Sequence, residues 1–470
     1  MKKSDNDNIL SQTDVMLIVP PSFEEGTLNA QPIPIGLISM HRVLNQANFW
    51  TEILNLSNAE DWNEVNDILI THGIPKVVGI SCFTRQRFSA VKVSELVKKL
   101  SPDTTVIIGG PHASFLDKQI LIRHPSVDYI IRGEGEYTFL DLVCHILCNT
   151  NVKTQLIPGI SYIDENAMFV RTANRTPIDD LSGLPPPLLT DEELSYLLLS
   201  DSLKFHFPKY KNGNIQIAPI ITSRGCDGNC TFCCNRAFWG NNRCAGVEYA
   251  YRQFSNYYNR NITFFDIYDD NFTSNMHHVN QLCDLLIDNR LLVNWWCSSR
   301  VDTIDIKLLR KMKQAGCFLI SFGAESGSQV ILDNINKGIK VEDIENACSM
   351  ARDAGLSFRL TISIGHLGET DTTINSTIEL INRTCPNQVA IFLLKVYPGT
   401  PIYNFCTAKQ LLSDDYWFDS ASPSVPIFTY EHTQDVLLSF RNRIINGIKA
   451  HVINTYEDEL FSIELDLSWD

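Results

Sequence analysis

The sequence lacks long hydrophobic runs and clusters of basic residues. No apolar stretch in the 470 residues approaches the roughly 18 that a membrane-spanning helix needs. Only 39 Lys and Arg stand against 54 Asp and Glu, so no basic surface is available to bind nucleic-acid phosphates. The opening MKKSDNDNILSQTD turns acidic instead of apolar. We therefore expect no membrane span, no signal peptide and no nucleic-acid partner.

The composition is that of a folded, soluble, multidomain protein. Apolar residues make up 44% and charged residues 20%, which excludes a disordered or fibrous chain. A length of 470 residues suits two or three domains. Several of the 14 cysteines lie inside apolar, core-like patterns, which favours a reducing compartment over a disulfide framework. We expect a cytoplasmic protein.

The first third of the chain alternates short β-branched runs with helical periodicity, a pattern typical of a doubly wound parallel sheet. The expected strands are residues 15–20, 52–55, 77–81, 105–108 and 128–131. Two glycine-containing turns follow the last two runs: Gly109-Gly110-Pro111-His112 and Arg132-Gly133-Glu134-Gly135-Glu136. Such turns lie at the carboxyl edge of the sheet, where α/β folds bind ligands. The sequence therefore predicts a Rossmann-like α/β domain with a ligand at this edge.

A second strand–helix alternation begins near Ile217. Its six expected strands are residues 218–223, 262–268, 293–298, 317–323, 357–364 and 388–395. Six β/α units predict a partial (β/α)6 barrel of the TIM type, with functional groups at the strand ends. The expected domains are a tail at 1–14, a first domain at 15–150, a linker at 151–215 with a hairpin in it, a barrel at 216–405 and a small, mostly helical region at 406–470.

The strongest chemical signal is a set of three cysteines directly after the first barrel strand. Cys226, Cys230 and Cys233 form a CxxxCxxC pattern. Three thiolates can each hold one iron of a [4Fe–4S] cluster and leave the fourth iron open. A zinc site is the alternative, but zinc prefers four ligands and no second CxxC pair is present. The other cysteines, including Cys234, fit packed thiols, so we expect one cluster.

This pattern, with Phe232 before the last cysteine, resembles the signature of the radical S-adenosylmethionine (SAM) superfamily. The resemblance continues in order at the later strand ends, where it implies SAM contacts at Asp269, Asp270, Ser299, Arg300, Glu325, Gly365 and Tyr397. One departure is the turn Gly365-His366-Leu367-Gly368-Glu369-Thr370, in which the family usually has Leu-Pro after the first glycine. Each matching position taken alone also fits a purely structural role, such as a helix cap for the two aspartates.

The first domain resembles the cobalamin-binding domain that precedes the barrel in one large class of radical SAM enzymes. The resemblance implies cobalamin contacts at Ser81, Cys82, Thr84, Gly109, Gly110, Pro111, His112, Gly133 and Glu134. A nucleotide-binding Rossmann domain is the alternative, but no GxGxxG follows the first strand. No histidine has Asp two residues before it, so the usual lower cobalt ligand pair is absent. We do not expect His112 to be an axial ligand.

The resemblance implies an enzyme with a [4Fe–4S] cluster, SAM and cobalamin. In the class, reductive cleavage of SAM gives a 5′-deoxyadenosyl radical that takes a hydrogen atom from a substrate, and methylcobalamin then methylates the carbon. We expect a C-methyltransferase for a small molecule, reduced by flavodoxin or ferredoxin. The alternatives are a radical cyclase, ring-contraction or rearrangement enzyme and, in another class, a corrinoid or iron–sulfur sensor. The sequence leaves open whether Trp239, Trp295, Trp296 or Lys395 contacts the substrate.

Overall fold

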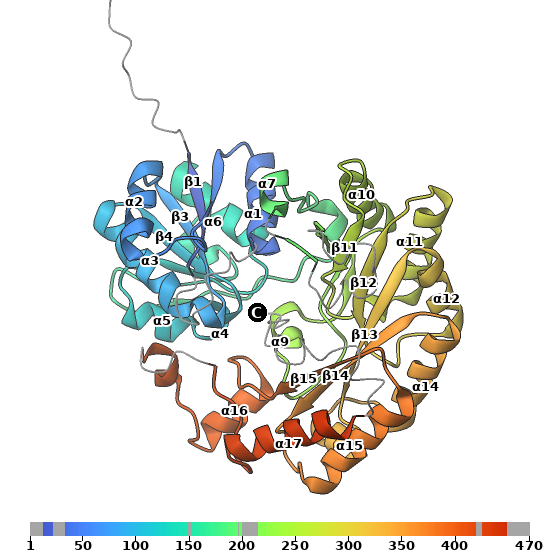
Figure 1. The fold of residues 1–470 in the computed structure, drawn as a ribbon. Helices are drawn as coiled ribbons and strands as arrows, with labels where there is room; N and C mark the ends of the chain where they lie inside the picture. The colour runs from blue at the N-terminus through green and yellow to red at the C-terminus, as the bar shows by residue number, and fades with distance from the viewer. Residues whose placement is uncertain are drawn as a thin grey trace, which may run out of the picture.

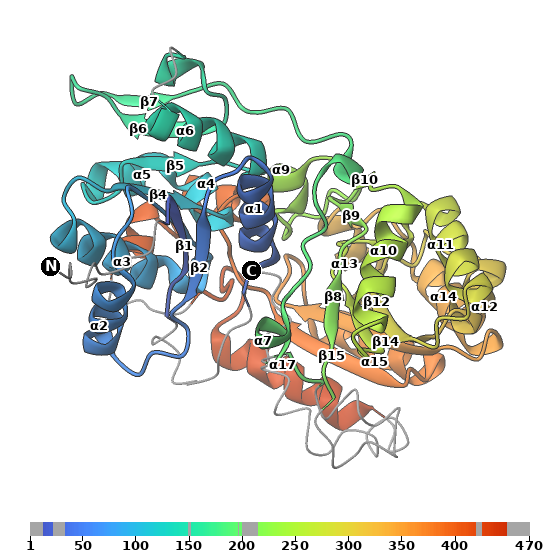
Figure 2. The same cartoon turned by 90° about the horizontal axis from the view of Figure 1, so that it is seen from above.

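The computed structural model describes residues 13–21, 33–148, 152–195, 197–199, 215–419 and 425–448. Most of the tail expected at 1–14 lies outside these residues, as do the later part of the expected linker and the end of the chain. The described part contains two large, mainly parallel sheets with helices around them, which Figures 1 and 2 show side by side, and one small two-stranded sheet. The α/β fold class predicted from the sequence is confirmed.

The first sheet is Rossmann-like, with parallel strands in the order β2-β1-β3-β4-β5. Its strands are β1 (Val15–Val19), β2 (Thr51–Asn55), β3 (Val77–Ser81), β4 (Thr105–Gly109) and β5 (Tyr129–Ile131). All five residues of β1 are buried, because helices cover both faces of the sheet. The helices are α1 (Ile35–Gln46), α2 (Trp62–His72), α3 (Arg87–Leu100), α4 (Pro111–Phe115), α5 (Asp117–Arg123) and α6 (Glu136–Cys148).

The first sheet continues past the boundary expected at residue 150. The hairpin expected in the linker is present as β6 (Ile160–Ile163) and β7 (Phe169–Arg171), and β6 pairs antiparallel with β5. The hairpin thereby covers the edge of β5, which would otherwise expose unpaired backbone groups. Farther along, Ile178, Leu181 and Leu184 pack with Val43 of α1 and Tyr249 of the second sheet's helices. This part of the expected linker is thus packed between the two sheets.

The second sheet has six parallel strands in the order β15-β14-β13-β12-β11-β8, as expected for a partial barrel. They are β8 (Ala218–Ile220), β11 (Phe264–Ile267), β12 (Asn294–Ser299), β13 (Cys317–Glu325), β14 (Ser357–Ile364) and β15 (Gln388–Leu393). An outer layer is formed by α10 (Val247–Tyr258), α11 (Met276–Asp288), α12 (Ile306–Gln314), α14 (Val341–Asp353) and α15 (Asp371–Thr384) (Figure 1). Smaller elements are β9 (Ser223–Arg224), α9 (Asn235–Trp239), β10 (Arg243–Cys244) and α13 (Gln329–Asn334).

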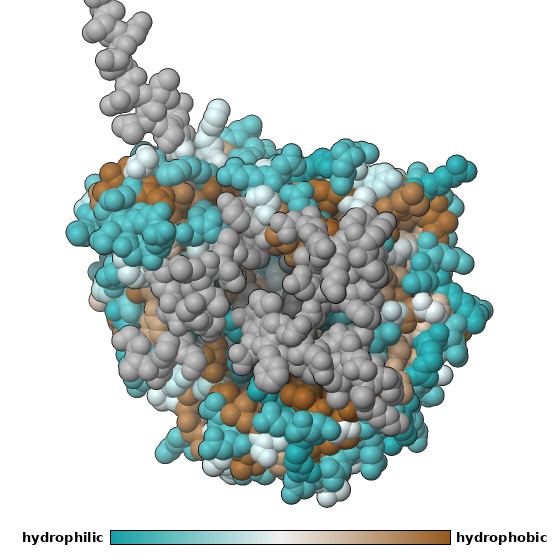
Figure 3. All heavy atoms as spheres, viewed as in Figure 1, coloured by the Kyte–Doolittle hydropathy of each residue, from teal (hydrophilic) through white to brown (hydrophobic). Residues whose placement is uncertain are grey.

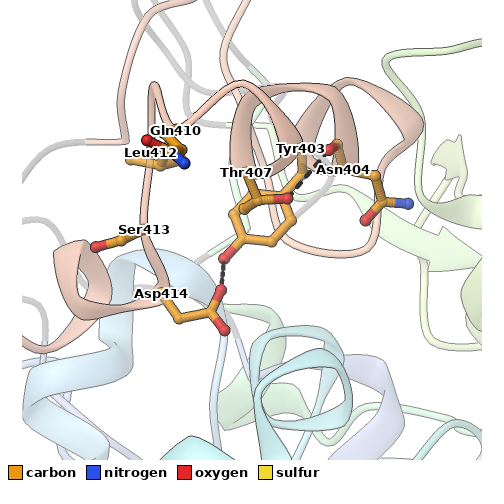
Figure 4. A pocket seen from close by; sticks show the side chains of 7 residues that line it. All are labelled: Tyr403, Asn404, Thr407, Gln410, Leu412, Ser413 and Asp414. Atoms are coloured by element: carbon orange, nitrogen blue, oxygen red, sulfur yellow. Dashed lines mark hydrogen bonds between the residues drawn. The ribbon is translucent and has the colours of Figure 1, made fainter.

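The C-terminal region joins both domains. It contains α16 (Pro401–Ala408), the 3-10 turn η7 (Asp414–Phe418) and α17 (Gln434–Gly447). Helix α17 packs on α15 and buries Leu437, Phe440 and Ile444 in the barrel core. In Figure 4 the hydroxyl of Tyr403 on α16 points to the carboxylate of Asp414, which ties α16 to η7. The region is therefore an integral part of the fold.

The described residues include no helix long and apolar enough to cross a membrane. On the face drawn in Figure 3, the coloured residues are largely hydrophilic, and the hydrophobic ones gather in separate small patches. Scattered patches of this size are usual on the surface of folded proteins.

Candidate active site

The carboxyl edges of the two sheets face each other. A Cβ placed on Gly133, after β5, would lie 3.8 Å from the Phe238 carbonyl oxygen on α9. A Cβ on Gly399, after β15, would lie 2.5 Å from the Phe115 ring on α4. Phe115 and Phe238 also pack together, with ring centroids 6.3 Å apart. The turns expected to bind cobalamin and the loop expected to hold the cluster are therefore neighbours.

The three cysteines lie in one half-buried loop between β9 and α9. Backbone N–H groups point at two of the sulfurs: Gly228 N donates to Cys226 Sγ at 3.3 Å and Asn235 N to Cys233 Sγ at 3.4 Å. A Cβ on Gly228 would lie 3.3 Å from Cys226 Sγ and 3.8 Å from Cys230 Sγ, so both thiols flank this glycine. Gly228 thus lies between two of the three thiols, where a side chain would crowd Cys226 Sγ.

The donor set fits a polynuclear cluster. Within the described residues, no three His, Cys, Asp or Glu side chains converge closely enough to hold one metal ion. The pKa of the Cys230 thiol is raised, mainly by burial, although the charges of Lys337 and Arg300 offset part of this rise. These two cations would offset the negative charge that thiolates and sulfide bring into the site. Three thiols are the donor set that a [4Fe–4S] cluster with one open iron uses.

The two aspartates after β11 brace this loop. Asp269 is completely buried, and its oxygens accept hydrogen bonds from Thr222 N at 2.7 Å and Ser223 Oγ at 2.8 Å. Asp270 accepts from Gly225 N at 3.0 Å and from Asn235 Nδ2 at 2.6 Å, which lie at the two ends of the cysteine loop. The SAM contact expected at Asp269 is therefore not supported, because no face of this carboxylate is accessible to a ligand.

Arg300 and Glu325 lie beside the cysteine loop with a lysine that the sequence analysis missed. Arg300 donates to Asp302 at 2.8 Å and to the Lys337 carbonyl at 2.8 Å, and its Nη1 would lie 3.2 Å from a Cβ on Gly228. Lys337 Nζ lies 2.7 Å from Glu325 Oε1, and both side chains are nearly buried. Burial lowers the pKa of Lys337, but Glu325 and Cys230 raise it more. Ser299 is buried, and its hydroxyl forms a hydrogen bond with the hydroxyl of Thr273.

The turn after β14 places a histidine next to Phe232. Gly365 has φ of +106° and donates its N–H to Glu369 Oε2 at 2.7 Å. His366 is buried 5.4 Å from the Phe232 ring, and its Nε2 has no hydrogen-bond partner among the described residues. Burial, with Lys337, lowers the pKa of His366 to about 3, so its ring is neutral. Tyr397 is half-buried in the turn that leads to α16.

The residues expected to contact cobalamin lie along the facing edge. Gly109, Gly110, Pro111 and Gly133 are half-buried, whereas Ser81, Cys82, Thr84 and His112 are buried. Cys82 and His112 line a cavity of about 350 Å³ together with Arg87 and Trp417. His112 Nδ1 is buried without a partner among the described residues, and burial lowers the pKa of His112 to about 3. Two of the residues expected to contact cobalamin, Cys82 and His112, therefore share one cavity, and its histidine is neutral.

Glu134 forms ion pairs between the two domains. Its carboxylate accepts hydrogen bonds from Arg224 at 3.1 Å, from Arg243 at 3.0 Å and from Ile178 N at 2.7 Å. Glu136 Oε1 accepts a hydrogen bond from the other terminal nitrogen of Arg224, Nη2, at 2.6 Å. These ion pairs are buried and join the turn after β5 to the strand that leads into the cysteine loop. The Glu134 carboxylate thus bridges the two domains, and the cobalamin contact expected at this turn stays a prediction.

Comparison with known families matches both halves of the chain. Residues 220–381 match the radical SAM superfamily, and residues 26–143 match the B12 binding domain. The chain combines a B12-binding domain with a radical SAM domain. It is homologous to cobalamin-dependent radical SAM methyltransferases, and these domains imply SAM, a [4Fe–4S] cluster and cobalamin as cofactors.

Two curated relatives illustrate the range of this group. The chain is 28% identical over 407 residues to an uncharacterized methyltransferase of Pyrococcus horikoshii, covering 86% of this chain and 85% of that protein. It is 26% identical to the anaerobic magnesium-protoporphyrin IX monomethyl ester cyclase of Rubrivivax gelatinosus, over 74% of this chain and 61% of the cyclase. The cyclase thus extends well beyond the part that this chain matches.

Solved structures share the fold. The methyltransferase TsrM from Kitasatospora setae, with tryptophan and a SAM analogue bound, aligns with a TM-score of 0.71 at 18% identity over 84% of this chain and 76% of TsrM. The cobalamin-dependent radical enzyme OxsB with aqua-cobalamin aligns with a TM-score of 0.70 at 18% identity, over 86% of this chain and 62% of OxsB. The order of a Rossmann-like domain followed by a radical SAM barrel is confirmed.

Proposed function

We propose that the protein methylates an unactivated carbon of a small molecule, with methylcobalamin as the methyl donor. The observation that carries this proposal is the direct contact between the two strand-end edges. Gly133 and Phe115 of the first domain lie against Phe238 and Gly399 of the second. A methyl group held at the first edge and a substrate radical formed at the second would then be neighbours. The homologous methyltransferases support the same conclusion.

Specific residues would hold each cofactor. Cys226, Cys230 and Cys233 would bind the cluster. SAM would lie among Phe232, Asp270, Ser299, Arg300, Glu325, Gly365 and Tyr397, and cobalamin along Ser81, Cys82, Thr84, Gly109, Gly110, Pro111, His112 and Gly133. When bound, the cluster supplies an electron to SAM, and cobalamin carries the methyl group.

The chain's own residues position these groups and keep water out. Asp270 holds both ends of the cysteine loop through Gly225 and Asn235. Arg224 holds the same loop against the first domain through Glu134 and Glu136. Fixed loops and a buried junction keep a reactive radical away from solvent.

Anaerobic reconstitution with iron, sulfide and hydroxocobalamin, followed by reduction with labelled SAM, tests the proposal. We expect S-adenosylhomocysteine and 5′-deoxyadenosine together, with label retained on bound cobalamin. Deoxyadenosine alone, with cobalamin that never becomes methylated, would favour the cyclase or rearrangement alternative. The similarity of the chain to a cyclase is the reason for testing this alternative. Absence of SAM cleavage by fully loaded protein would favour a sensor. A Cys230→Ala variant provides the control without a complete cluster.

We also infer the surroundings in which the enzyme works. None of its 14 cysteines forms a disulfide, which supports a reducing compartment such as the cytoplasm. The cluster needs an external electron donor, and a flavodoxin or ferredoxin is the class of protein that supplies one. Reduction of the reconstituted cluster by either protein, followed by electron paramagnetic resonance, tests this donor.

A further inference from the structure

A short segment after α13, residues 335–337, holds the chain on both sides of the second cluster cysteine. Thr231 N donates to the Ile335 carbonyl at 2.9 Å, and Asn336 Nδ2 donates to the Asn229 carbonyl at 3.0 Å. Asn336 has φ of +53°, a left-handed conformation that asparagine adopts more readily than most residues. The cysteine between these two contacts is thereby held against the 335–337 segment.

An arginine fixes the last residue of this segment relative to the thiols. Arg300 Nη2, in the loop after β12, donates to the Lys337 carbonyl at 2.8 Å. The other terminal nitrogen of Arg300, Nη1, would lie 3.2 Å from a Cβ on Gly228. The same Cβ would lie within 4 Å of the sulfurs of Cys226 and Cys230. The backbone of Lys337 is therefore anchored beside the cysteine loop.

The ammonium group of Lys337 is buried at the end of β13. Its Nζ lies 2.7 Å from Glu325 Oε1 and would lie 2.9 Å from a Cβ on Gly323. Only 7% of the Lys337 side chain is exposed, so water and salt screen its charge little. Contact with a carboxylate favours the charged form of a buried amine. Lys337 therefore carries a fixed positive charge in this part of the barrel.

This charge acts on Cys230. The pKa of the Cys230 thiol is raised, mainly by burial, and Lys337 offsets this rise more than Arg300 does. Glu325 adds to the rise, but by less than Lys337 offsets. Burial lowers the pKa of Lys337, whereas Glu325 and Cys230 raise it more. The ammonium group thus has more influence on negative charge at Cys230 than the carboxylate of its own ion pair has.

Reduction of a [4Fe–4S] cluster adds negative charge at these cysteines. The donor protein is oxidised by one electron, and the cluster goes from the 2+ to the 1+ state. Net charge and solvent exposure set the reduction potential of such clusters. A fixed cation in a site with little water favours the reduced state, and a fixed anion opposes it. The charges of Lys337 and Glu325 should therefore shift the potential in opposite directions.

We propose that Lys337 raises the reduction potential of the cluster, and that the 335–337 segment holds the lysine in place for this role. The cluster then accepts an electron more readily from a flavodoxin or ferredoxin. Glu325 keeps Lys337 charged and limits the size of the effect. The inference concerns the cluster alone, goes beyond methyl transfer and does not depend on it.

A redox titration of the full-length reconstituted protein tests the proposal. Electron paramagnetic resonance follows the signal of the reduced cluster under anaerobic conditions, without SAM or substrate. We expect Lys337→Met to make reduction about tenfold less favourable, which lowers the potential by about 59 mV for one electron. Lys337→Arg keeps the charge and should stay near wild type, and Glu325→Gln should raise the potential. Lys307→Met removes an exposed lysine on α12 and is the matched control.

The opposite shifts of Lys337→Met and Glu325→Gln separate an electrostatic role from a structural one. Melting temperature and iron content show that each variant is folded and loaded. If Lys337→Met does not take up iron, the double variant Lys337→Met/Glu325→Leu replaces it, and its potential should fall by less than tenfold in equilibrium constant. An unchanged potential in the loaded variant that lacks the lysine would overturn the inference, as would shifts of the same sign in Lys337→Met and Glu325→Gln. A failed methyltransferase assay with the expected potentials would reject only the proposed function.

Discussion

Lys337 and Glu325 bring two opposite charges into the barrel where a cysteine thiol also lies. Their contact of 2.7 Å is nearly buried, and Glu325 adopts φ of +64°, a conformation uncommon for a residue with a side chain. The strand end is therefore held in a strained geometry by an ion pair. Each charge depends on its partner, because water is largely excluded from both.

We expect Lys337→Met to destabilise the protein by about 3–5 kcal/mol, because it leaves the Glu325 carboxylate buried without its partner. The double variant Lys337→Met/Glu325→Leu should recover most of this loss. Denaturant unfolding checks the prediction on the two variants and on the control Lys311→Met, whose half-buried side chain pairs with the more exposed Asp284. A double variant that is less stable than the single one would contradict it.

Asp266 should make stability depend on pH. Burial raises the pKa of Asp266 in the folded protein to about 8, above its ordinary value. The free energy of unfolding is therefore highest below about pH 4, where Asp266 is protonated in both states, and falls as the pH rises to about 8. Asp266→Asn cannot ionise and should gain stability over wild type across this range, by an amount on the order of a few kcal/mol. Unfolding at pH 5, 7 and 9 measures the difference. Parallel pH curves for Asp266→Asn and wild type would reject the shift.

At the scale of elements, the turn after β5 is bonded to the strand that precedes the cysteine loop. Glu136 is buried, and although burial raises its pKa, Arg224 lowers that pKa more. Arg224 stands two residues before Cys226, so its position sets where the cysteine loop begins. The first domain thus orients the cluster loop through buried ion pairs and not only through the packing of apolar groups.

We expect Arg224→Met to cost about 3–5 kcal/mol, because it leaves two buried carboxylates with one arginine fewer. Iron incorporation should fall with it, as the cysteine loop loses its anchor. Arg260→Met is the matched control, since Arg260 pairs with the exposed Asp191 and should change stability by less than about 1 kcal/mol. Melting curves and iron content measure both variants. A loss of stability in Arg224→Met no larger than that in Arg260→Met would show that the buried ion pairs contribute no more than an exposed one.

At the scale of the whole molecule, the C-terminal segment ties the barrel to the B12-binding domain. Trp417 of η7 is buried, and its ring centroid lies 5.6 Å from that of His112. Its carbonyl accepts from Arg87 Nε at 3.2 Å, and its indole N–H donates to the Tyr403 hydroxyl at 3.1 Å. One residue late in the chain thereby closes the cavity beside the expected cobalamin edge.

We expect Trp417→Ala to destabilise the protein by about 3–5 kcal/mol and to weaken cobalamin retention, because it opens this cavity. Absorbance after desalting measures the bound cobalamin, and melting temperature measures stability. Trp50→Ala removes an exposed indole and should leave both values near wild type. Full retention of cobalamin in a destabilised Trp417→Ala would show that the residue serves folding alone.

Much of the fold could be predicted from the sequence because its signals are local. Buried parallel strands require short β-branched runs, and all eleven expected strands of the two sheets are present close to their predicted bounds. The cysteine spacing also identifies the loop after β8 by itself. The sequence did not reveal the role of Glu134 or Asp269, because their partners Arg224 and Thr222 lie 90 and 47 residues away.

The sequence by itself determined the class of protein: two α/β domains, a three-cysteine loop and the strand-end motifs around it. These features follow from residue types and short spacings, which act through local backbone preference and ligand chemistry. Only the tertiary structure decided which strand-end side chains brace a loop. It also decided that Lys337 pairs with Glu325 beside the cysteine loop and that Trp417 packs on His112. Burial and long-range contact set these roles, and neither is encoded in a local pattern.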